Sequence, residues 1–91
     1  MNRTNVCVVG CGYWGKNLIR TFSALGNLRG IYDVDSEQAV RVSSLYAGVV
    51  TYDTYESVLN DSSVAAVVLA TPAERHYDMA MAALLLFCLT A

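Results

Sequence analysis

The chain has 91 residues, of which 55% are apolar and 15% are charged, and its formal net charge is −2. This composition can build one small hydrophobic core and excludes an intrinsically disordered chain. The slightly negative charge argues against nucleic acid as a partner. The apolar tail at residues 79–91 is shorter than the ~20 residues of a membrane-spanning helix, so we expect no membrane partner.

The cysteines give a first indication of the compartment. Cys7, Cys11 and Cys88 form an odd set without the spacing of metal ligands, which fits a reducing environment. Residues 8–11 (VVGC) resemble a lipoprotein cleavage box, but the apolar block before them is too short for a signal peptide. We therefore expect a cytoplasmic location.

The most informative feature is an apolar run at residues 6–9 that leads directly into glycines spaced G-x-G-x-x-G. In such a strand–turn–helix unit, Gly10 permits a sharp turn and Gly12 has no Cβ to hold a diphosphate away. Gly15 lets the helix pack closely on its strand. The N-terminus of that helix would point at the phosphates. The run therefore predicts a turn that binds a dinucleotide.

The rest of the chain alternates between strand and helix patterns. We expect strands at residues 5–9, 28–32, 49–51 and 64–70, and helices at residues 13–25, 36–46, about 54–60 and 72–86. This alternation predicts an α/β fold, one domain over residues 1–91, with helices on both faces of a parallel sheet. The expected strand order is 3-2-1-4, which brings the glycine turn, Asp33 and Thr71-Pro72 to one edge.

Two helices carry a predicted inward face. Trp14, Leu18, Phe22 and Leu25 recur at helical spacing and predict one buried stripe on the first helix. On the second helix, the residues expected to face inward are Ala39, Val40 and Leu45.

Asp33 ends the second expected strand. A carboxylate there can accept hydrogen bonds from both hydroxyls of an adenosine ribose, and it would repel a 2′-phosphate. No Lys or Arg follows it immediately, so NAD is favoured over NADP as the cofactor. The alternative is that Asp33 merely begins a turn. Asp35 is the expected cap of the second helix.

Other side chains near the expected rim each have two possible roles. Trp14 is expected half in the core and half in the wall of a cofactor pocket, and Tyr13 either contacts the dinucleotide or stays exposed. Lys16 either neutralises phosphate or is a surface lysine. Thr71 is expected to cap the last helix and to reach a ligand. His76 either faces the crevice or is an ordinary packed or surface histidine.

Three segments together resemble the Gfo/Idh/MocA oxidoreductases: residues 10–18 (GCGYWGKNL), 33–35 (DVD) and 70–77 (ATPAERHY). The resemblance covers about residues 5–85 and is closest to members that oxidise UDP-N-acetyl sugars or their uronates. It implies a Rossmann-type domain, an oxidoreductase function on a sugar or nucleotide sugar, and a set of NAD(P)-binding residues. Those residues are Gly10, Gly12, Tyr13, Trp14, Gly15 and Asp33, with Thr71, Pro72 and His76 on the nicotinamide side. We expect no metal site, since the cysteines lack the spacing of metal ligands.

The sequence also departs from this family. The family continues with a glycine-lysine turn, a fifth strand, a Glu-Lys-Pro motif with a catalytic lysine, and a substrate-binding domain. Residues 85–91 (LLFCLTA) carry none of these. We therefore expect a partial domain with no catalytic residue, inactive by itself, whose fourth strand is a sheet edge open to self-association.

Two other functions stay open at this point. The chain could be a non-catalytic module that binds a dinucleotide or pairs its edge strand with another chain. It could also be a fragment of an S-adenosylmethionine methyltransferase, which shares the glycine loop and the acid after the second strand. The Thr-Pro-x-x-x-His segment at residues 71–76 has no role in such an enzyme.

Overall fold

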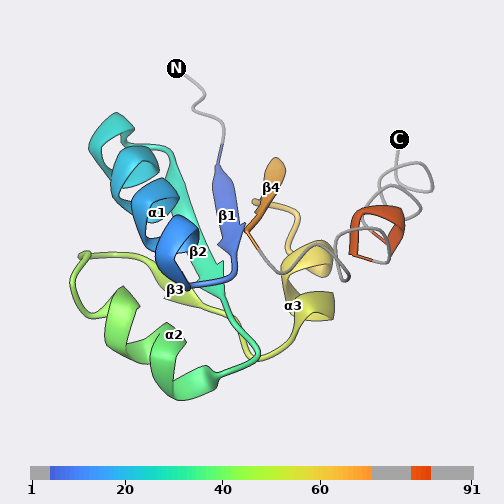
Figure 1. Ribbon diagram of the computed structural model, residues 1–91. Helices are drawn as coiled ribbons and strands as arrows, with labels where there is room; N and C mark the ends of the chain where they lie inside the picture. The colour runs from blue at the N-terminus through green and yellow to red at the C-terminus, as the bar shows by residue number, and fades with distance from the viewer. Residues whose placement is uncertain (1–4, 71–78, 83–91) are drawn as a thin grey trace.

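The computed structural model describes residues 5–70 and 79–82 (Figure 1). Its elements, in chain order, are β1 (Val6–Val9), α1 (Tyr13–Leu25), β2 (Leu28–Tyr32), α2 (Ser36–Ser43), β3 (Val50–Thr51), α3 (Tyr55–Asn60) and β4 (Ala66–Leu69). The strands form one parallel sheet in the order β3-β2-β1-β4, which confirms the predicted topology. Helices α1 and α2 lie beside one face of the sheet, and α3 lies beside the other (Figure 1).

The register brings the carboxyl ends of the central strands to one level. Val9, the last residue of β1, pairs with Tyr32 at the end of β2 and with Leu69 at the end of β4. The pairing continues one residue further, because Gly10 N donates to Tyr32 O at 2.7 Å and Ala70 N donates to Val9 O at 2.8 Å. The segments that follow these three strands therefore start side by side at one rim.

Strand β1 is the centre of the core, and all four of its residues are buried. Val6 and Val8 face α1 and α2, where they pack in a cluster that contains Ile19, Ile31 and Val42. Cys7 and Val9 face α3, in a second cluster with Tyr52, Val58 and Val64. A strand that is apolar on both faces fits its position between two layers of helix.

Helix α1 has the predicted bounds, but its predicted buried stripe is wrong at both ends. Trp14 and Leu25 are exposed, while Leu18 and Phe22 are half-buried. The fully buried position is Ile19, which shares the face with the buried Gly15. The face toward the sheet is thus rotated by one residue at the first turn, which leaves Trp14 at the rim.

Helix α2 is shorter than predicted, since it ends at Ser43 instead of Tyr46. Its buried residues are Ala39 and Val42, whereas Val40 and Leu45, which were expected to face inward, are exposed. Positions i and i+3 lie on one helix face, and that face alone meets the sheet. Strands β3 and β4 are also shorter than expected, and β4 is a half-buried edge strand of the described sheet.

A polar cluster ties the turn before β4 to β2 and β3. We call it the Asp61 cluster; it consists of Arg29, Tyr52, Asp61 and Ser63. Asp61 accepts hydrogen bonds from the Tyr52 hydroxyl at 2.5 Å and from Ser63 N at 2.9 Å, besides the Ser63 hydroxyl. Arg29 Nη2 lies 3.4 Å from the same carboxylate. The bonds from Ser63 and Tyr52 hold the pKa of Asp61 well below its usual range.

Tyr52 reaches Asp61 because its ring lies directly across Gly30 of β2. A Cβ at Gly30 would come within 2.5 Å of a ring carbon of Tyr52 and 2.7 Å of Val50 O. The ring is buried, and this burial together with the bond to Asp61 raises the pKa of Tyr52 to about 12. The glycine thus makes room for the tyrosine that joins β3 to the Asp61 cluster.

Candidate functional site

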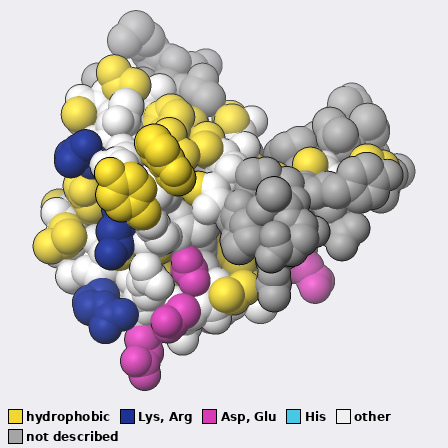
Figure 2. Space-filling model, viewed as in Figure 1, with side chains coloured by type: hydrophobic (Ala, Val, Ile, Leu, Met, Phe, Trp, Pro, Cys, Tyr) yellow, Lys and Arg dark blue, Asp and Glu magenta, His cyan; other side chains and the backbone are white. Residues whose placement is uncertain are grey.

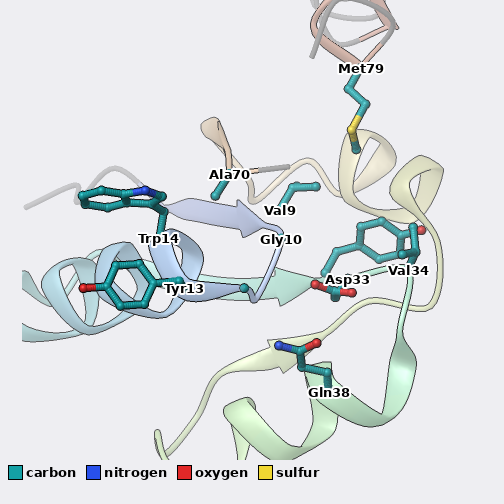
Figure 3. A pocket seen from close by; sticks show the side chains of 11 residues that line it. Val9, Gly10, Tyr13, Trp14, Asp33, Val34, Gln38, Ala70 and Met79 are labelled. Atoms are coloured by element: carbon teal, nitrogen blue, oxygen red, sulfur yellow. The ribbon is translucent and has the colours of Figure 1, made fainter. Parts of the chain in front are cut away.

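A cavity of about 540 Å³ opens at the carboxyl rim of the sheet (Figure 3). Its walls come from the end of β1 and the turn after it, the start of α1, the end of β2 and the segment after it, α2, the residue after β4, and Met79. The lining residues are Val9, Gly10, Gly12, Tyr13, Trp14, Tyr32, Asp33, Val34, Gln38, Ala70 and Met79. The cavity lies where the register gathers the strand ends, which is the position at which open parallel sheets bind ligands.

The glycine turn needs two of its glycines for its own geometry and leaves the third free. Gly10 has φ of 105°, a left-handed conformation that side chains disfavour. A Cβ on Gly15 would overlap the carbonyl oxygen of Gly10, so the close approach of α1 to the turn requires glycine there. A Cβ on Gly12 would meet no atom of the described residues within 4 Å. Since Gly12 lines the cavity, that open space is available to a ligand.

The N-terminus of α1 is suited to an anion. Its N-cap is Gly12, no side chain of the part of the protein that the structure describes caps it, and its first turn contains no acidic residue. The free N–H groups and the helix dipole therefore present positive potential to the cavity that Gly12, Tyr13 and Trp14 line.

Asp33 begins a turn and also lines the cavity. Its Oδ1 accepts from Asp35 N at 2.8 Å, while its Oδ2 accepts from Cys11 N in the glycine turn at 2.7 Å. These bonds use two of about four acceptor positions of a carboxylate, and Asp33 lines the cavity. It keeps the capacity to accept from two further donors.

Asp35 is the N-cap of α2, as predicted. Its Oδ1 accepts from Glu37 N at 3.1 Å and from Gln38 N at 3.2 Å. Its own N–H is bonded to Asp33. The start of α2 is therefore fixed by two successive carboxylates.

Gln38 is a cavity residue that sequence reasoning missed. Its Nε2 donates to Cys11 O at 2.6 Å, across 27 residues of sequence. The sequence pattern around Gln38 predicts a different contact. Asp35-x-x-Gln38 is typical of a capping box, in which the Gln side chain bonds the N–H of the N-cap residue. Here Asp33 already bonds that N–H, and Gln38 reaches the glycine turn instead.

Tyr13 and Trp14 form an aromatic wall at the mouth of the cavity. Their rings meet edge to face with centroids 5.5 Å apart, and their exposed fractions are 78% and 71%. The expectation that Trp14 lies half in the core is therefore wrong. Figure 3 shows both rings on the side of the turn away from Asp33 and Gln38.

The structure gathers five of the predicted cofactor residues at one cavity: Gly10, Gly12, Tyr13, Trp14 and Asp33. Gly15 lies buried beneath the turn. Thr71, Pro72 and His76 lie outside the described residues. Val34 and Ala70, which also line the cavity, belong to two of the segments that carry the family resemblance, whereas no motif marked Tyr32 or Met79.

The two described cysteines are buried and chemically quiet. Burial raises the pKa of Cys7 to about 12 and that of Cys11 to about 11, with the charge of Asp33 adding to the shift at Cys11. Both are neutral thiols near pH 7 and therefore poor nucleophiles. Residues 5–70 and 79–82 contain no group of three or more His, Cys, Asp or Glu that could hold a metal ion. Within the same residues, no helix has the length and apolarity needed to cross a membrane.

A parallel sheet of order 3-2-1-4, with a glycine turn and an acid after β2 at its switch point, defines a partial Rossmann domain. Comparison with known families identifies which one. Residues 4–89 match the oxidoreductase family Gfo/Idh/MocA, NAD-binding Rossmann fold. The chain belongs to this family. The match favours an oxidoreductase domain over the methyltransferase alternative.

Solved structures of longer proteins contain the same domain. A NAD-binding protein from Listeria innocua is 32% identical with a TM-score of 0.82, over 93% of this chain and 25% of its own. GenD2 from gentamicin A biosynthesis, solved with NAD, is 27% identical with a TM-score of 0.85, over 94% of this chain and 25% of its own.

A third relative was solved with a nucleotide sugar. The WlbA dehydrogenase from Bordetella pertussis, in complex with NADH and UDP-GlcNAcA, is 25% identical with a TM-score of 0.83. The match covers 94% of this chain and 26% of the dehydrogenase. The 91 residues thus span about a quarter of the length of these proteins. No curated protein matches the chain.

Proposed function

We propose that the cavity at the sheet rim binds NAD. The diphosphate lies at Gly12 and the N-terminus of α1, and Asp33 accepts hydrogen bonds from the adenosine ribose. The observation that carries this proposal is the 2.7 Å bond between Asp33 Oδ2 and Cys11 N. It places the acid directly beside the glycine turn, so that the ribose and the diphosphate of one ligand can meet both.

The charges around the cavity support a dinucleotide and favour NAD over NADP. Asp33 would repel a 2′-phosphate, and residues 34–36 carry no cation. Positive side chains gather over α1 and α2 in Figure 2, where Lys16, Arg20 and Arg41 line a groove of about 470 Å³ between the two helices. Gln38 lines both this groove and the cavity, so the positive potential adjoins the proposed diphosphate site.

The proposed reaction class is oxidation of a CH–OH group on a sugar or nucleotide sugar. NAD supplies a nicotinamide ring that accepts a hydride. Thr71, Pro72 and His76 are proposed to line the nicotinamide side, as the family resemblance implies, and Tyr13 and Trp14 to shield it from water. WlbA, solved with UDP-GlcNAcA, supports a nucleotide sugar as the substrate class. The 91 residues hold no Glu-Lys-Pro motif, so we expect them by themselves to bind cofactor without turnover.

Binding can be measured without a label because Trp14 is the single tryptophan of the chain and lines the cavity. Titration with NADH should quench Trp14 and transfer its excitation to the dihydronicotinamide, with saturation. NADPH should bind more weakly. A folded sample, checked by circular dichroism, that shows no saturable signal at millimolar NADH would contradict the proposal. Oxidation of a UDP-sugar by the 91 residues would contradict the expected inactivity.

A second candidate function is an interaction module that pairs an edge strand with another copy. The observation that favours it is β4, which pairs with β1 on one side and is the edge of the described sheet. Exposed strand edges are templates for pairing. Sedimentation velocity over a hundredfold range of concentration distinguishes the two cases, since a constant monomer mass argues against self-association.

A further inference from the structure

Cys11, the residue between the first two glycines of the turn, is held in three ways. Its side chain is fully buried in the cluster that packs beneath α1 and α2. Its N–H donates to Asp33 Oδ2 at 2.7 Å, and its C=O accepts from Gln38 Nε2 at 2.6 Å. Two side chains from the β2–α2 segment thus bind both polar groups of this residue.

These two hydrogen bonds to Cys11 also restrict the backbone of the glycines beside it. Glycine has the largest backbone freedom of any residue, so a G-x-G turn is intrinsically loose. Fixing the peptide groups on either side of Cys11 restricts Gly10 and Gly12 together. A turn that is already restricted loses less conformational entropy when it binds a ligand.

Gln38 can make this contact because another residue already binds the N–H group that its side chain would bond in a capping box. The N–H of Asp35, which a capping-box Gln would bond, already donates to Asp33 Oδ1 at 2.8 Å. Gln38 is only partly buried and occupies the helix face that points at the turn (Figure 3). Its amide Nε2 therefore donates to Cys11 O, and the structure describes no hydrogen bond from this amide to its own helix.

We propose that Gln38 is a positioning residue for the diphosphate site. It acts through the carbonyl of Cys11, holds the glycine turn in its binding geometry, and couples α2 to the diphosphate site. This role rests on the proposed binding of NAD. It is distinct from the role of Asp33, which the proposal places in contact with the ribose.

The test replaces the donor without changing size or charge. Gln38→Met should weaken NADH binding about three- to tenfold, the range expected for one lost hydrogen bond. Val40→Met is the matched control, because Val40 is an exposed position on the same helix and lines no part of the cavity. It should bind NADH like wild type. Gln38→Glu is a second variant; it removes the donor near pH 7 and adds a negative charge beside the proposed diphosphate, so it should weaken binding more than Gln38→Met does.

A second readout separates positioning from general stability. Loosening the turn should expose the thiol of Cys11 and increase its rate of alkylation severalfold in Gln38→Met. Cys7 is the internal reference, because it is buried within β1 and becomes accessible only when the sheet opens. Mass spectrometry of the alkylated peptides gives the ratio of Cys11 to Cys7 modification.

The outcomes are distinguishable. A raised Cys11 ratio with weaker NADH binding supports the inference. Unchanged binding in both Gln38 variants overturns it, and so does weaker binding with an unchanged ratio, which would mean direct contact with the ligand. If wild type itself shows no saturable NADH binding, the proposed function fails instead, while the Cys11 ratio still reports whether Gln38 holds the turn.

Discussion

Asp33 and Asp61 are both partly buried aspartates in loops beside the sheet, and they differ in how many of their acceptor positions the chain itself fills. Asp61 receives four hydrogen bonds, from Tyr52, Arg29 and two groups of Ser63. Asp33 receives two from the residues that the structure describes, both from backbone N–H groups. A carboxylate offers about four positions, so the described residues fill those of Asp61 and leave two of Asp33 open.

This difference separates a structural acid from a candidate binding acid. The Asp61 cluster joins β2, β3 and the turn before β4, and its donors depress the pKa of Asp61. Asp33 instead has unfilled acceptor capacity beside a cavity of about 540 Å³. Changes at the Asp61 cluster should therefore act mainly on stability, and changes at the rim mainly on binding.

Substitutions in the glycine turn should have the largest effect. Unlike other changes at the rim, one of them should lower both stability and NADH binding. Gly15→Ala should lower the free energy of unfolding by about 3 kcal/mol and abolish NADH binding, because its Cβ would overlap Gly10 O. Gly12→Ala is the matched control. Its Cβ meets no atom of residues 5–70 and 79–82, so stability should change little while NADH binding weakens about tenfold or more. Urea denaturation and Trp14 quenching measure the two quantities. Equal stability of both variants would contradict the role of Gly15.

The pair of aspartates tests the comparison directly. Asp33→Ala should weaken NADH binding about 10- to 100-fold, the range for lost hydrogen bonds to a charged group. Asp61→Ala should lower the melting temperature more than Asp33→Ala does and leave NADH affinity within about twofold of wild type. Melting curves and NADH titrations of both variants suffice. The same loss of binding in both would remove the distinction between the two acids.

Within the Asp61 cluster, Tyr52→Phe should have a smaller effect. It removes the hydroxyl that donates to Asp61 and keeps the ring that covers Gly30, so we expect a loss of about 1–2 kcal/mol in the free energy of unfolding. Tyr13→Phe is the control, since Tyr13 is exposed. Urea denaturation at pH 7 should leave the control at the wild-type midpoint. If Tyr52→Phe also does so, the cluster contributes no stability.

A comparable loss of stability is expected at alkaline pH. The ordinary pKa of a thiol is 9.0, and burial raises it to about 12 in Cys7 and to about 11 in Cys11. Because the pKa is higher in the folded state, the stability that comes from burying the two neutral thiols is complete below pH 9. It is lost as the pH rises through about 11 to 12. At pH 10 the loss should be about 1 kcal/mol per thiol. Urea denaturation under reducing conditions at pH 7.5, 9 and 10 should show a falling midpoint, and a flat profile would contradict the burial of both thiols.

At acid pH the stability should fall as the pH is lowered, and the group responsible is Asp61. Its folded pKa lies below the ordinary value of 3.8, so the stability that it contributes is present above about pH 4 and is lost as pH falls below that value. Denaturation of wild type and Asp61→Ala at pH 7 and pH 3.5 should show a smaller pH dependence in the variant. An identical dependence would assign the acid sensitivity to other groups.

The sequence predicted the sheet order, the bounds of α1 and the cap at Asp35, because these depend on local signals: glycine spacing, apolar runs and a capping carboxylate. It misplaced Trp14 and Val40, because the face that a helix turns to the sheet depends on how the helix docks and cannot be read from spacing alone. It missed Gln38, because the bond to Cys11 joins residues 27 apart and forms only after the fold brings them together.

Gly30 shows a consequence of tight packing at a position that does not line the cavity. A saturation-mutagenesis screen for activity would find nearly every replacement there harmful, since any Cβ collides with the Tyr52 ring and Val50 O. Sensitivity maps alone would then mark Gly30 as a functional residue. Screens that score abundance together with activity would assign it correctly to the architecture.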